Sequence, residues 1–233
     1  MKIIISILIT ILIFNCQDKA SRQTATKITD SIAKINESTK QNIATKKQQY
    51  PKLTDENAMD FFLEFEKENK ENKVRITTDF GTIDILLFEE TKFHRANFIF
   101  LTKQGYFDGT QFYRIVNNFV IQGGNSDEMV AAEKRRKIGK YLLPKDTRHG
   151  FTHNKGVISM PSSEIENPYK LASPYEFFIV QQTGGAKHLD GDYTIFGKVI
   201  AGLDVVDTIA AQETDGSEWP LHNIYIKKVE IID

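Results

Sequence analysis

The sequence is poor in cysteine and has no surplus of charge of either sign. One cysteine in 233 residues excludes an intramolecular disulfide and any metal site built from several cysteines. The chain has 30 Lys and Arg residues against 31 Asp and Glu residues, and this balance argues against binding of nucleic acid over its whole surface. With 40% hydrophobic residues, the composition is that of a folded domain, and collagen-like, disulfide-rich and strongly disordered classes are excluded.

A long hydrophobic run is also missing. The apolar run within residues 1–16, MKIIISILITILIFNC, is shorter than the roughly 20 residues that a membrane-spanning helix needs, and its basic start is typical of a secretory signal. A cysteine at its end, Cys16, resembles the lipobox of bacterial lipoproteins, although the residues at 13–15 are not small. We expect a lipidated Cys16 and an exported, membrane-anchored lipoprotein on the periplasmic or cell-surface side of a bacterial envelope. An uncleaved anchor with a buried Cys16 is the alternative.

The segment after Cys16 has a polar composition. Residues 17–49 are mostly Lys, Gln, Thr, Ser, Asn and Ala, with no tryptophan or phenylalanine. Such a segment buries too little apolar surface to offset the entropy of ordering it, and we expect a flexible stalk over residues 17–53. A helical extension is expected over residues 54–72, because Thr54 can cap a helix whose apolar face carries phenylalanines. This helix is expected to pack against the domain that follows.

One domain is expected from residue 73 to residue 233, and its strands are short. Alternating β-branched runs flank Asp79-Phe80-Gly81 and predict a hairpin over residues 74–88. The further strand candidates cover residues 111–116, 119–122, 157–160, 177–181, 194–200 and 223–232. Helical spacing and glycine signals predict two helices, over residues 94–104 and 203–211. This mainly β pattern favours a closed or nearly closed antiparallel barrel over a layered α/β fold.

Four sequence blocks in this domain carry a family resemblance. They are FYRIVNNFVIQGG at residues 112–124, GVISM at 156–160, FFIV at 177–180 and LDGDYTIFGKV at 189–199. In this order they resemble the cyclophilins, the barrel-shaped peptidyl-prolyl cis–trans isomerases. The resemblance implies an eight-stranded antiparallel β-barrel capped by two helices. It also implies an isomerase without a cofactor that acts on proline-containing or unfolded polypeptides.

The chemistry of prolyl isomerisation defines what such a site needs. Rotation about an X–Pro bond faces a barrier of about 18–20 kcal/mol, and as the bond twists the prolyl nitrogen gains a lone pair that accepts a hydrogen bond. An arginine offers permanent charge and several donors in a rigid fork, and Arg114 is expected to fill this role. An apolar pocket grips the proline ring and excludes water.

The resemblance assigns roles by position in the family's motifs. The expected catalytic residues are Arg114, Phe119 and Gln122, and Gln122 is expected to hold the peptide backbone and the Arg114 side chain. The expected substrate-binding residues are Val120, Met160, Pro161, Ser162, Glu176, Phe178, His188, Leu189 and Tyr193. Taken singly, such apolar residues are more often barrel core and a strand arginine is more often a solvated charge; the ordered motif is what favours function.

The sequence departs from the family pattern beside this site. Glu176 stands where the family usually has glutamine, and Pro161 stands where a small residue usually follows Met160. The family layout implies an ion pair between Glu176 and Arg114, which either fixes the guanidinium or draws it away from the substrate nitrogen. We expect reduced activity from Glu176 and altered sequence preference from Pro161, which lacks a backbone donor.

Two other patterns are weaker. The basic cluster at residues 134–137, with Lys140, is expected to be a solvated helix face, and anionic lipid headgroups fit it better than nucleic acid does. His149 and His153 have a spacing found in metal sites, but Gly150 disfavours a helix there and no third ligand is adjacent. No metal site and no nucleic-acid partner are therefore expected.

Three functions remain open on the sequence. The favoured one is a membrane-tethered, monomeric prolyl isomerase that assists the folding of exported proteins. A low-activity module that binds proline-containing segments as a chaperone or scaffold is the alternative, which Glu176 and Pro161 keep open. A purely structural surface lipoprotein is disfavoured, because it leaves the groove residues unexplained.

Overall fold

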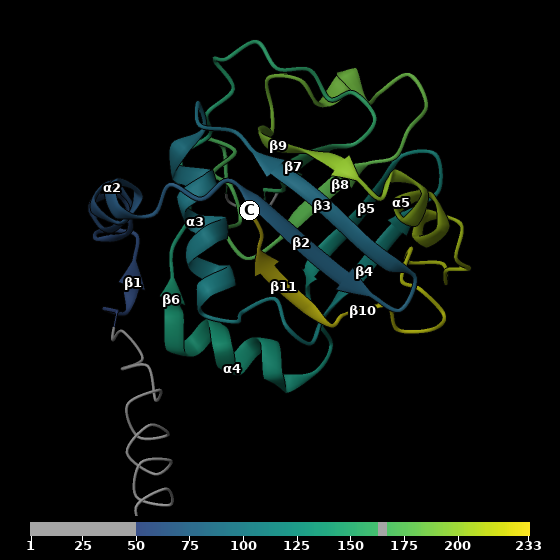
Figure 1. Ribbon diagram of the computed structural model, residues 1–233, viewed down its shortest axis with the longest axis horizontal. Coiled ribbons are helices and arrows are strands. Elements are labelled where there is room, and N and C mark those ends of the chain that lie inside the picture. The colour runs from purple at the N-terminus through teal and green to yellow at the C-terminus, as the bar shows by residue number, and fades with distance from the viewer. Residues whose placement is uncertain (1–49, 163–166) are drawn as a thin grey trace, which may run out of the picture. The chain divides into compact units, whose positions relative to one another are not determined.

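The centre of the fold is an antiparallel sheet that curls into a nearly closed barrel (Figure 1). The computed structural model describes residues 50–162 and 167–233, and residues 51–233 form one compact unit. The predicted signal segment, Cys16 and the stalk up to residue 49 lie outside the described residues. No helix in the described part of the chain is long and apolar enough to cross a membrane.

Nine strands form this sheet, in the order β10-β4-β5-β8-β7-β9-β3-β2-β11. Their bounds are β2 Lys73–Thr78, β3 Gly81–Leu87, β4 Thr110–Val116, β5 Val120–Asn125, β7 Val157–Met160, β8 Phe177–Val180, β9 Thr194–Ala201, β10 Tyr225–Ile226 and β11 Lys228–Ile231. The predicted hairpin at residues 74–88 is confirmed as β2 and β3, which pair from Lys73 with Leu86 to Thr78 with Gly81.

The C-terminal segment brings the two edges of the sheet together. β10 pairs with β4 at one edge, and β11 pairs with β2 at the other. The break between them falls at Lys227, whose backbone N–H donates to the Thr77 carbonyl at 2.8 Å. The segment expected as one strand over residues 223–232 is thus two short strands, which is why the barrel has nine strands where eight were expected.

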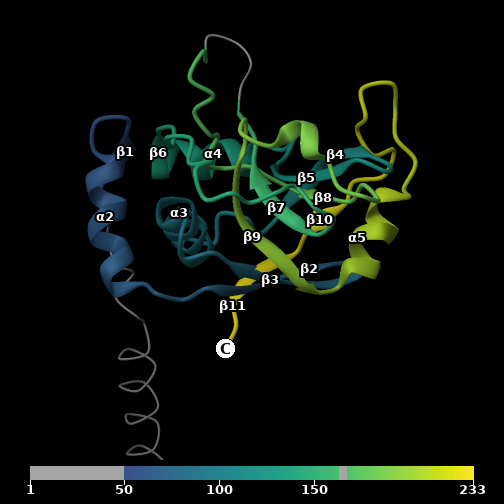
Figure 2. The same ribbon diagram turned by 90° about the horizontal axis from the view of Figure 1, so that it is seen from above.

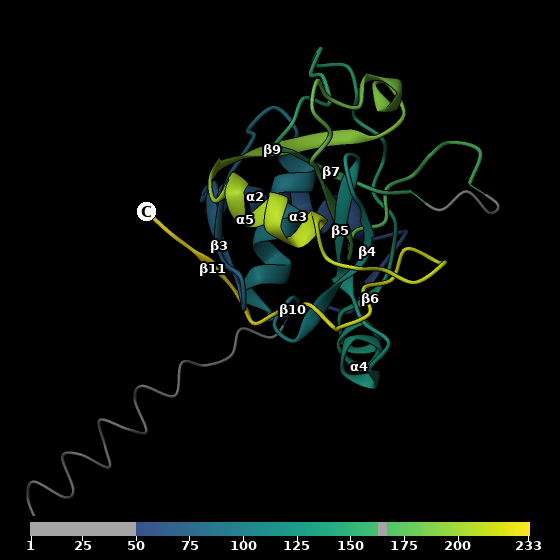
Figure 3. The same cartoon turned by 90° about the vertical axis from the view of Figure 1, so that its right-hand side faces the viewer.

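Two helices lie at opposite ends of the barrel, as predicted (Figure 2). They are α3, Lys92–Lys103, and α5, Leu203–Ala210. In the view of Figure 3, α5 stands in front of α3 with the strands around both. Residues 94–102 of α3 are all buried, because this helix is covered by the sheet on one side and by the N-terminal extension on the other.

The N-terminal extension packs on the barrel as expected, but its helix starts later than predicted. β1, Leu53–Thr54, pairs in parallel with β6, Gly139–Lys140, and α2 runs over Ala58–Glu68. Thr54 is therefore a strand residue and does not cap the helix. Phe62 and Phe65 of α2 meet Phe100 of α3 edge to face, at centroid distances of 5.8 and 5.5 Å. This contact makes α2 part of the compact unit.

A fourth helix crosses the surface beside β6. This helix, α4, spans Met129–Ile138 and contains the basic cluster of residues 134–137. The expectation that the cluster is a solvated face is wrong for two of its members. The Lys134 ammonium donates to the carbonyls of Gly105 and Asp108 at 2.8 and 2.5 Å. Arg135 donates from Nε to the Tyr106 hydroxyl at 2.7 Å. Arg136 and Lys137 are exposed, and so is Lys140 after the helix.

Burial of His94 in α3 makes the stability of the fold depend on pH. Neither ring nitrogen has a hydrogen-bond partner among the described residues, and burial lowers the pKa of His94 from 6.5 to about 4. Between these values the unfolded chain binds a proton that the folded chain does not, so stability falls as pH drops.

At pH 5 the parent is expected to have lost about 2 kcal/mol through His94 relative to pH 7.5. Urea denaturation at both pH values checks this, and His94→Leu is expected to show a shallower loss. Equal losses would contradict the assignment.

Candidate active site

One cavity gathers most of the predicted site residues. It has a volume of about 390 Å³ and lies over β4, β5 and β8. Nine of the predicted residues line it: Arg114, Phe119, Val120, Gln122, Pro161, Ser162, Phe178, Leu189 and Tyr193. Three others, Met160, Glu176 and His188, do not. Four segments thus meet in this cavity: the β4–β5 hairpin, residues 161–162, β8 and residues 189–193.

The register of three neighbouring strands places the central residues of the cavity side by side. Arg114 of β4 is opposite Gln122 of β5, and Gln122 is opposite Phe178 of β8. Residues directly opposite each other in an antiparallel ladder point to the same face, with Cβ atoms about 5 Å apart. The sheet therefore presents a donor, an amide and an aromatic ring as one row.

The inner wall of the cavity is apolar. Val120 and Phe178 are 3% and 5% exposed, and Phe119, Leu189 and Tyr193 pack against them. The Tyr193 ring meets the Phe178 ring edge to face at a centroid distance of 5.7 Å. Such a wall accepts a small apolar ring and excludes water from it.

The outer side of the cavity is polar and centres on Arg114, whose side chain is 36% exposed. Its Nε donates to Oε2 of Glu218 at 2.7 Å, and its other guanidinium N–H groups have no partner among the described residues. Ser162 Oγ is buried and also has no partner there. The guanidinium is thus held at one atom and offers the rest of its donors to the cavity.

Glu218 is a residue that the sequence analysis missed. It has a left-handed backbone, with φ of 65°, in a turn that Asp215 stabilises by accepting from the N–H groups of Ser217 and Trp219 at 2.8 and 3.0 Å. The Glu218 carbonyl accepts from the Ile115 N–H at 2.8 Å, which fixes the turn beside β4. Asp215-Gly216 is a turn signal, but nothing in the local sequence indicates that the turn reaches Arg114.

We expect Glu218→Gln to lower kcat for a proline peptide about fivefold and to leave KM within about twofold, because the amide keeps the hydrogen bond but loses the charge that orients Arg114. Steady-state isomerisation kinetics measure this. Glu213→Gln, an exposed carboxylate in the same turn region, is the matched control and is expected to be neutral. A kcat equal to that of the parent would contradict an orienting role for Glu218.

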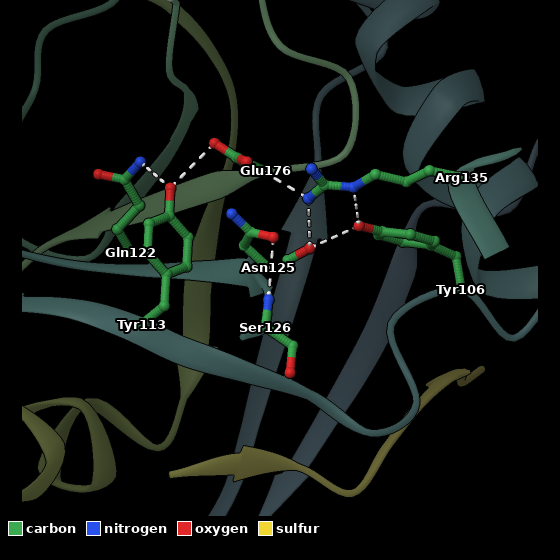
Figure 4. Close-up of polar contacts among 8 residues, drawn as sticks. Tyr106, Tyr113, Gln122, Asn125, Ser126, Arg135 and Glu176 are labelled. Carbon is green, nitrogen blue, oxygen red and sulfur yellow. Dashed lines mark hydrogen bonds and ion pairs between the residues drawn. The ribbon is translucent and has the colours of Figure 1, made fainter. Parts of the chain in front are cut away.

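The expected ion pair between Glu176 and Arg114 is wrong. Glu176 Oε1 accepts from Nη2 of Arg135 at 3.3 Å, and Oε2 accepts from the Tyr113 hydroxyl at 2.9 Å (Figure 4). Tyr113 in turn accepts from Nε2 of Gln122, the only one of these side chains that lines the cavity. Burial and the neighbouring carboxylate both hold the pKa of Tyr113 well above its usual value, so its hydroxyl stays a donor. Arg135 binds Glu176 in place of Arg114, so this ion pair gives no reason to expect reduced activity.

Met160 and His188 lie next to the cavity. Met160 is 1% exposed and belongs to the barrel core. The His188 ring stacks on Phe119 at a centroid distance of 5.4 Å and supports it from outside.

The histidine pair considered as a metal site is engaged elsewhere. His153 Nδ1 lies 2.7 Å from Asp190 Oδ1, and His149 Nε2 lies 3.1 Å from Asp146 Oδ2. Within residues 50–162 and 167–233 no three His, Cys, Asp or Glu side chains gather as metal ligands would.

Comparison with known proteins places this domain in a family by its sequence and its fold. The family model described as "Cyclophilin type peptidyl-prolyl cis-trans isomerase/CLD" matches residues 73–231. A peptidyl-prolyl cis-trans isomerase of Arabidopsis thaliana is 34% identical over 160 residues, which cover 68% of this chain and 94% of that protein. A peptidyl-prolyl cis-trans isomerase of Acinetobacter baylyi is 31% identical over 164 residues, which cover 68% of this chain and 82% of that protein.

Some relatives are much longer than the matched region. A peptidyl-prolyl cis-trans isomerase-like protein of Rhizopus delemar is 34% identical over 169 residues, which cover 72% of this chain but only 30% of that protein. Among solved structures, a cyclophilin type peptidyl-prolyl cis-trans isomerase of Cryptosporidium parvum superposes with a TM-score of 0.59 at 28% identity, covering 70% of this chain and 98% of that one. By sequence and by fold, the chain belongs to the cyclophilin-type peptidyl-prolyl cis–trans isomerase family.

Proposed function

We propose that the chain isomerises X–Pro bonds in the cavity described above, with Arg114 as the catalytic donor. The observation that carries this proposal is the meeting of Arg114 and an apolar wall in one cavity. The wall of Phe119, Val120 and Phe178 grips the proline ring, so the free guanidinium donors of Arg114 lie over the ring nitrogen. No covalent bond forms or breaks.

The rate gain comes from a hydrogen bond that forms only as the bond twists. In the planar amide the prolyl nitrogen has no available lone pair, and Arg114 gains little from it. At the twisted transition state the nitrogen becomes pyramidal and accepts a guanidinium N–H, so the twisted form is stabilised and the planar form is not. Exclusion of water removes competing donors and strengthens this contact.

The polar side of the cavity is suited to hold the peptide backbone. Gln122 is fixed at Nε2 by Tyr113, so its Oε1 is left to accept a backbone N–H. The unpartnered Ser162 Oγ offers a second hydrogen-bonding group. A related structure from Cryptosporidium parvum was determined in the presence of the dipeptide Ala-Pro, which supports a proline peptide as the ligand class.

A chymotrypsin-coupled assay tests the activity. The protein is expected to accelerate the cis-to-trans step of an acetylated Ala-Ala-Pro-Phe anilide in proportion to enzyme concentration. A protein that binds this peptide without accelerating isomerisation would instead be the binding module considered above.

We further propose that the chain acts on exported proteins while tethered to a membrane through lipidated Cys16. The support is the short apolar run that ends at this cysteine. Metabolic labelling with a radioactive fatty acid tests it, because the label is expected in the parent and absent in Cys16→Ser. Equal labelling of both proteins would contradict the anchor.

A further inference from the structure

A second cavity lies beside the first and is not used by the proposed mechanism. It has a volume of about 480 Å³. Its lining comes from α4, from β6 and the two residues after it, from the segment before β8, and from Lys52. Lys52 lies outside residues 73–231, the region that the family model matches. The N-terminal extension, which the family model does not cover, therefore contributes one residue to a cavity whose other lining residues lie within the matched region.

Positive charge dominates this second cavity. Among the residues that the structure describes, four cationic side chains line it, Lys52, Arg135, Arg136 and Lys140, against the single carboxylate of Glu176. Arg135 is paired with Glu176. The other three cations are exposed, and none of them has an ion-pair partner within 4.0 Å among the described residues. The charge on the rim is thus unbalanced.

The floor of the second cavity is less polar than its rim. Tyr141 and Tyr175 are 2% and 7% exposed, and Pro174 also lines the cavity. The Arg135 guanidinium lies over the Tyr175 ring, 5.3 Å from its centroid. A ligand that fits this shape has an aliphatic stem and an anionic end.

The two cavities share walls. Glu176 lines the second cavity, and only the Tyr113 hydroxyl separates it from Gln122 of the first (Figure 4). On the other side, the Ser173 N–H donates to the Pro161 carbonyl at 2.7 Å, and these residues line the second and first cavities respectively. Glu176 directly precedes β8 and is two residues before Phe178, a separation of about 7 Å at 3.3 Å per extended residue. A single extended peptide can therefore reach both cavities.

From this geometry we infer that the second cavity binds an acidic side chain of the same peptide whose proline occupies the first. The inference rests on the proposed function. A peptide residue two or three positions from the proline spans the shared wall, and its carboxylate meets Lys52, Arg136 and Lys140. The pairs form at exposed groups, so each contributes modestly and is screened by salt. The cavity acts as a specificity site and leaves the catalytic step unchanged.

Acetylated hexapeptides test the inference. Each contains one proline and either Glu or Gln at the second or third position before or after it, and isomerisation by the full chain is followed by NMR exchange spectroscopy. For at least one position, the Glu peptide is expected to have a KM about fivefold below that of its Gln counterpart at low salt, with the same kcat. At about 1 M NaCl, where the screening length is about 3 Å, this difference is expected to vanish.

Two charge reversals on α4 locate the effect. Arg136→Glu is expected to abolish or invert the preference for the Glu peptide. Lys137→Glu changes the net charge equally but does not line the cavity, and it is expected to keep the preference. Equal KM values for Glu and Gln peptides at every position in the parent, or equal effects of the two reversals, would overturn the inference while the proposed function stands. If the parent isomerises no peptide of the series, the proposed function fails and the inference fails with it.

Discussion

Replacing Arg114 by alanine is expected to lower kcat/KM for a proline peptide about 100- to 1,000-fold, because the variant loses the only cationic donor among the described residues that line the first cavity. The free energy of unfolding is expected to stay within about 1 kcal/mol of the parent's, since Arg114 and its partner Glu218 are both partly exposed, at 36% and 43%. The coupled protease assay measures the rate, and urea denaturation measures the stability.

Two matched variants separate catalysis from charge and packing. Arg75→Ala removes another arginine that is paired with a carboxylate, Asp84, on a strand of the same sheet, and it is expected to retain full activity. Arg114→Lys keeps the charge but loses the rigid fork and is expected to recover only part of the rate. If Arg114→Ala retained more than about a third of the parent's kcat/KM, Arg114 would not be the catalytic donor.

The local sequence pattern predicted the strands and helices whose bounds depend on neighbouring residues. β7 was predicted with its observed bounds, Val157–Met160, because an apolar run lies there between a glycine and a proline. The gathering of nine predicted residues in one cavity followed from an ordered family motif, since such a motif encodes the register of β4, β5 and β8. The motif does not encode which residues elsewhere in the chain contact its members.

The misses are all contacts between distant parts of the chain. Glu218 reaches Arg114 across 104 positions, and Glu176 meets Arg135 across 41 positions where a pair with Arg114 was expected. Thr54 was expected to cap α2, but Leu53 and Thr54 pair with Gly139 and Lys140. In each case tertiary pairing overrides a local preference, and one sequence offers no signal for the choice of a distant partner.

Replacing Arg95 by alanine is expected to destabilise the protein by about 3–4 kcal/mol, because it removes one partner of a buried ion pair. The Arg95 side chain is 2% exposed, and its Nη2 donates to Glu66 Oε1 at 2.6 Å while Nη1 donates to the Lys70 carbonyl at 2.9 Å. The variant leaves the carboxylate of Glu66, whose side chain is only 13% exposed, with the exposed Lys70 as its partner, and it opens a cavity the size of a guanidinium between α2 and α3. Urea denaturation monitored by circular dichroism measures the loss.

Lys70→Ala is the matched control, because Lys70 binds the same Glu66 oxygen at 2.6 Å but is 62% exposed, and its loss is expected to cost less than about 1 kcal/mol. Equal costs for the two variants would show that burial of Arg95 is not what anchors α2.

Because Lys52 lies six residues before α2 and lines the second cavity, loosening α2 is also expected to weaken the preference for acidic peptides without lowering kcat on neutral ones. Amide hydrogen exchange over residues 51–72 reports this loosening directly. A variant that exchanges faster there yet keeps the full acidic preference would show that Lys52 is not part of the specificity site.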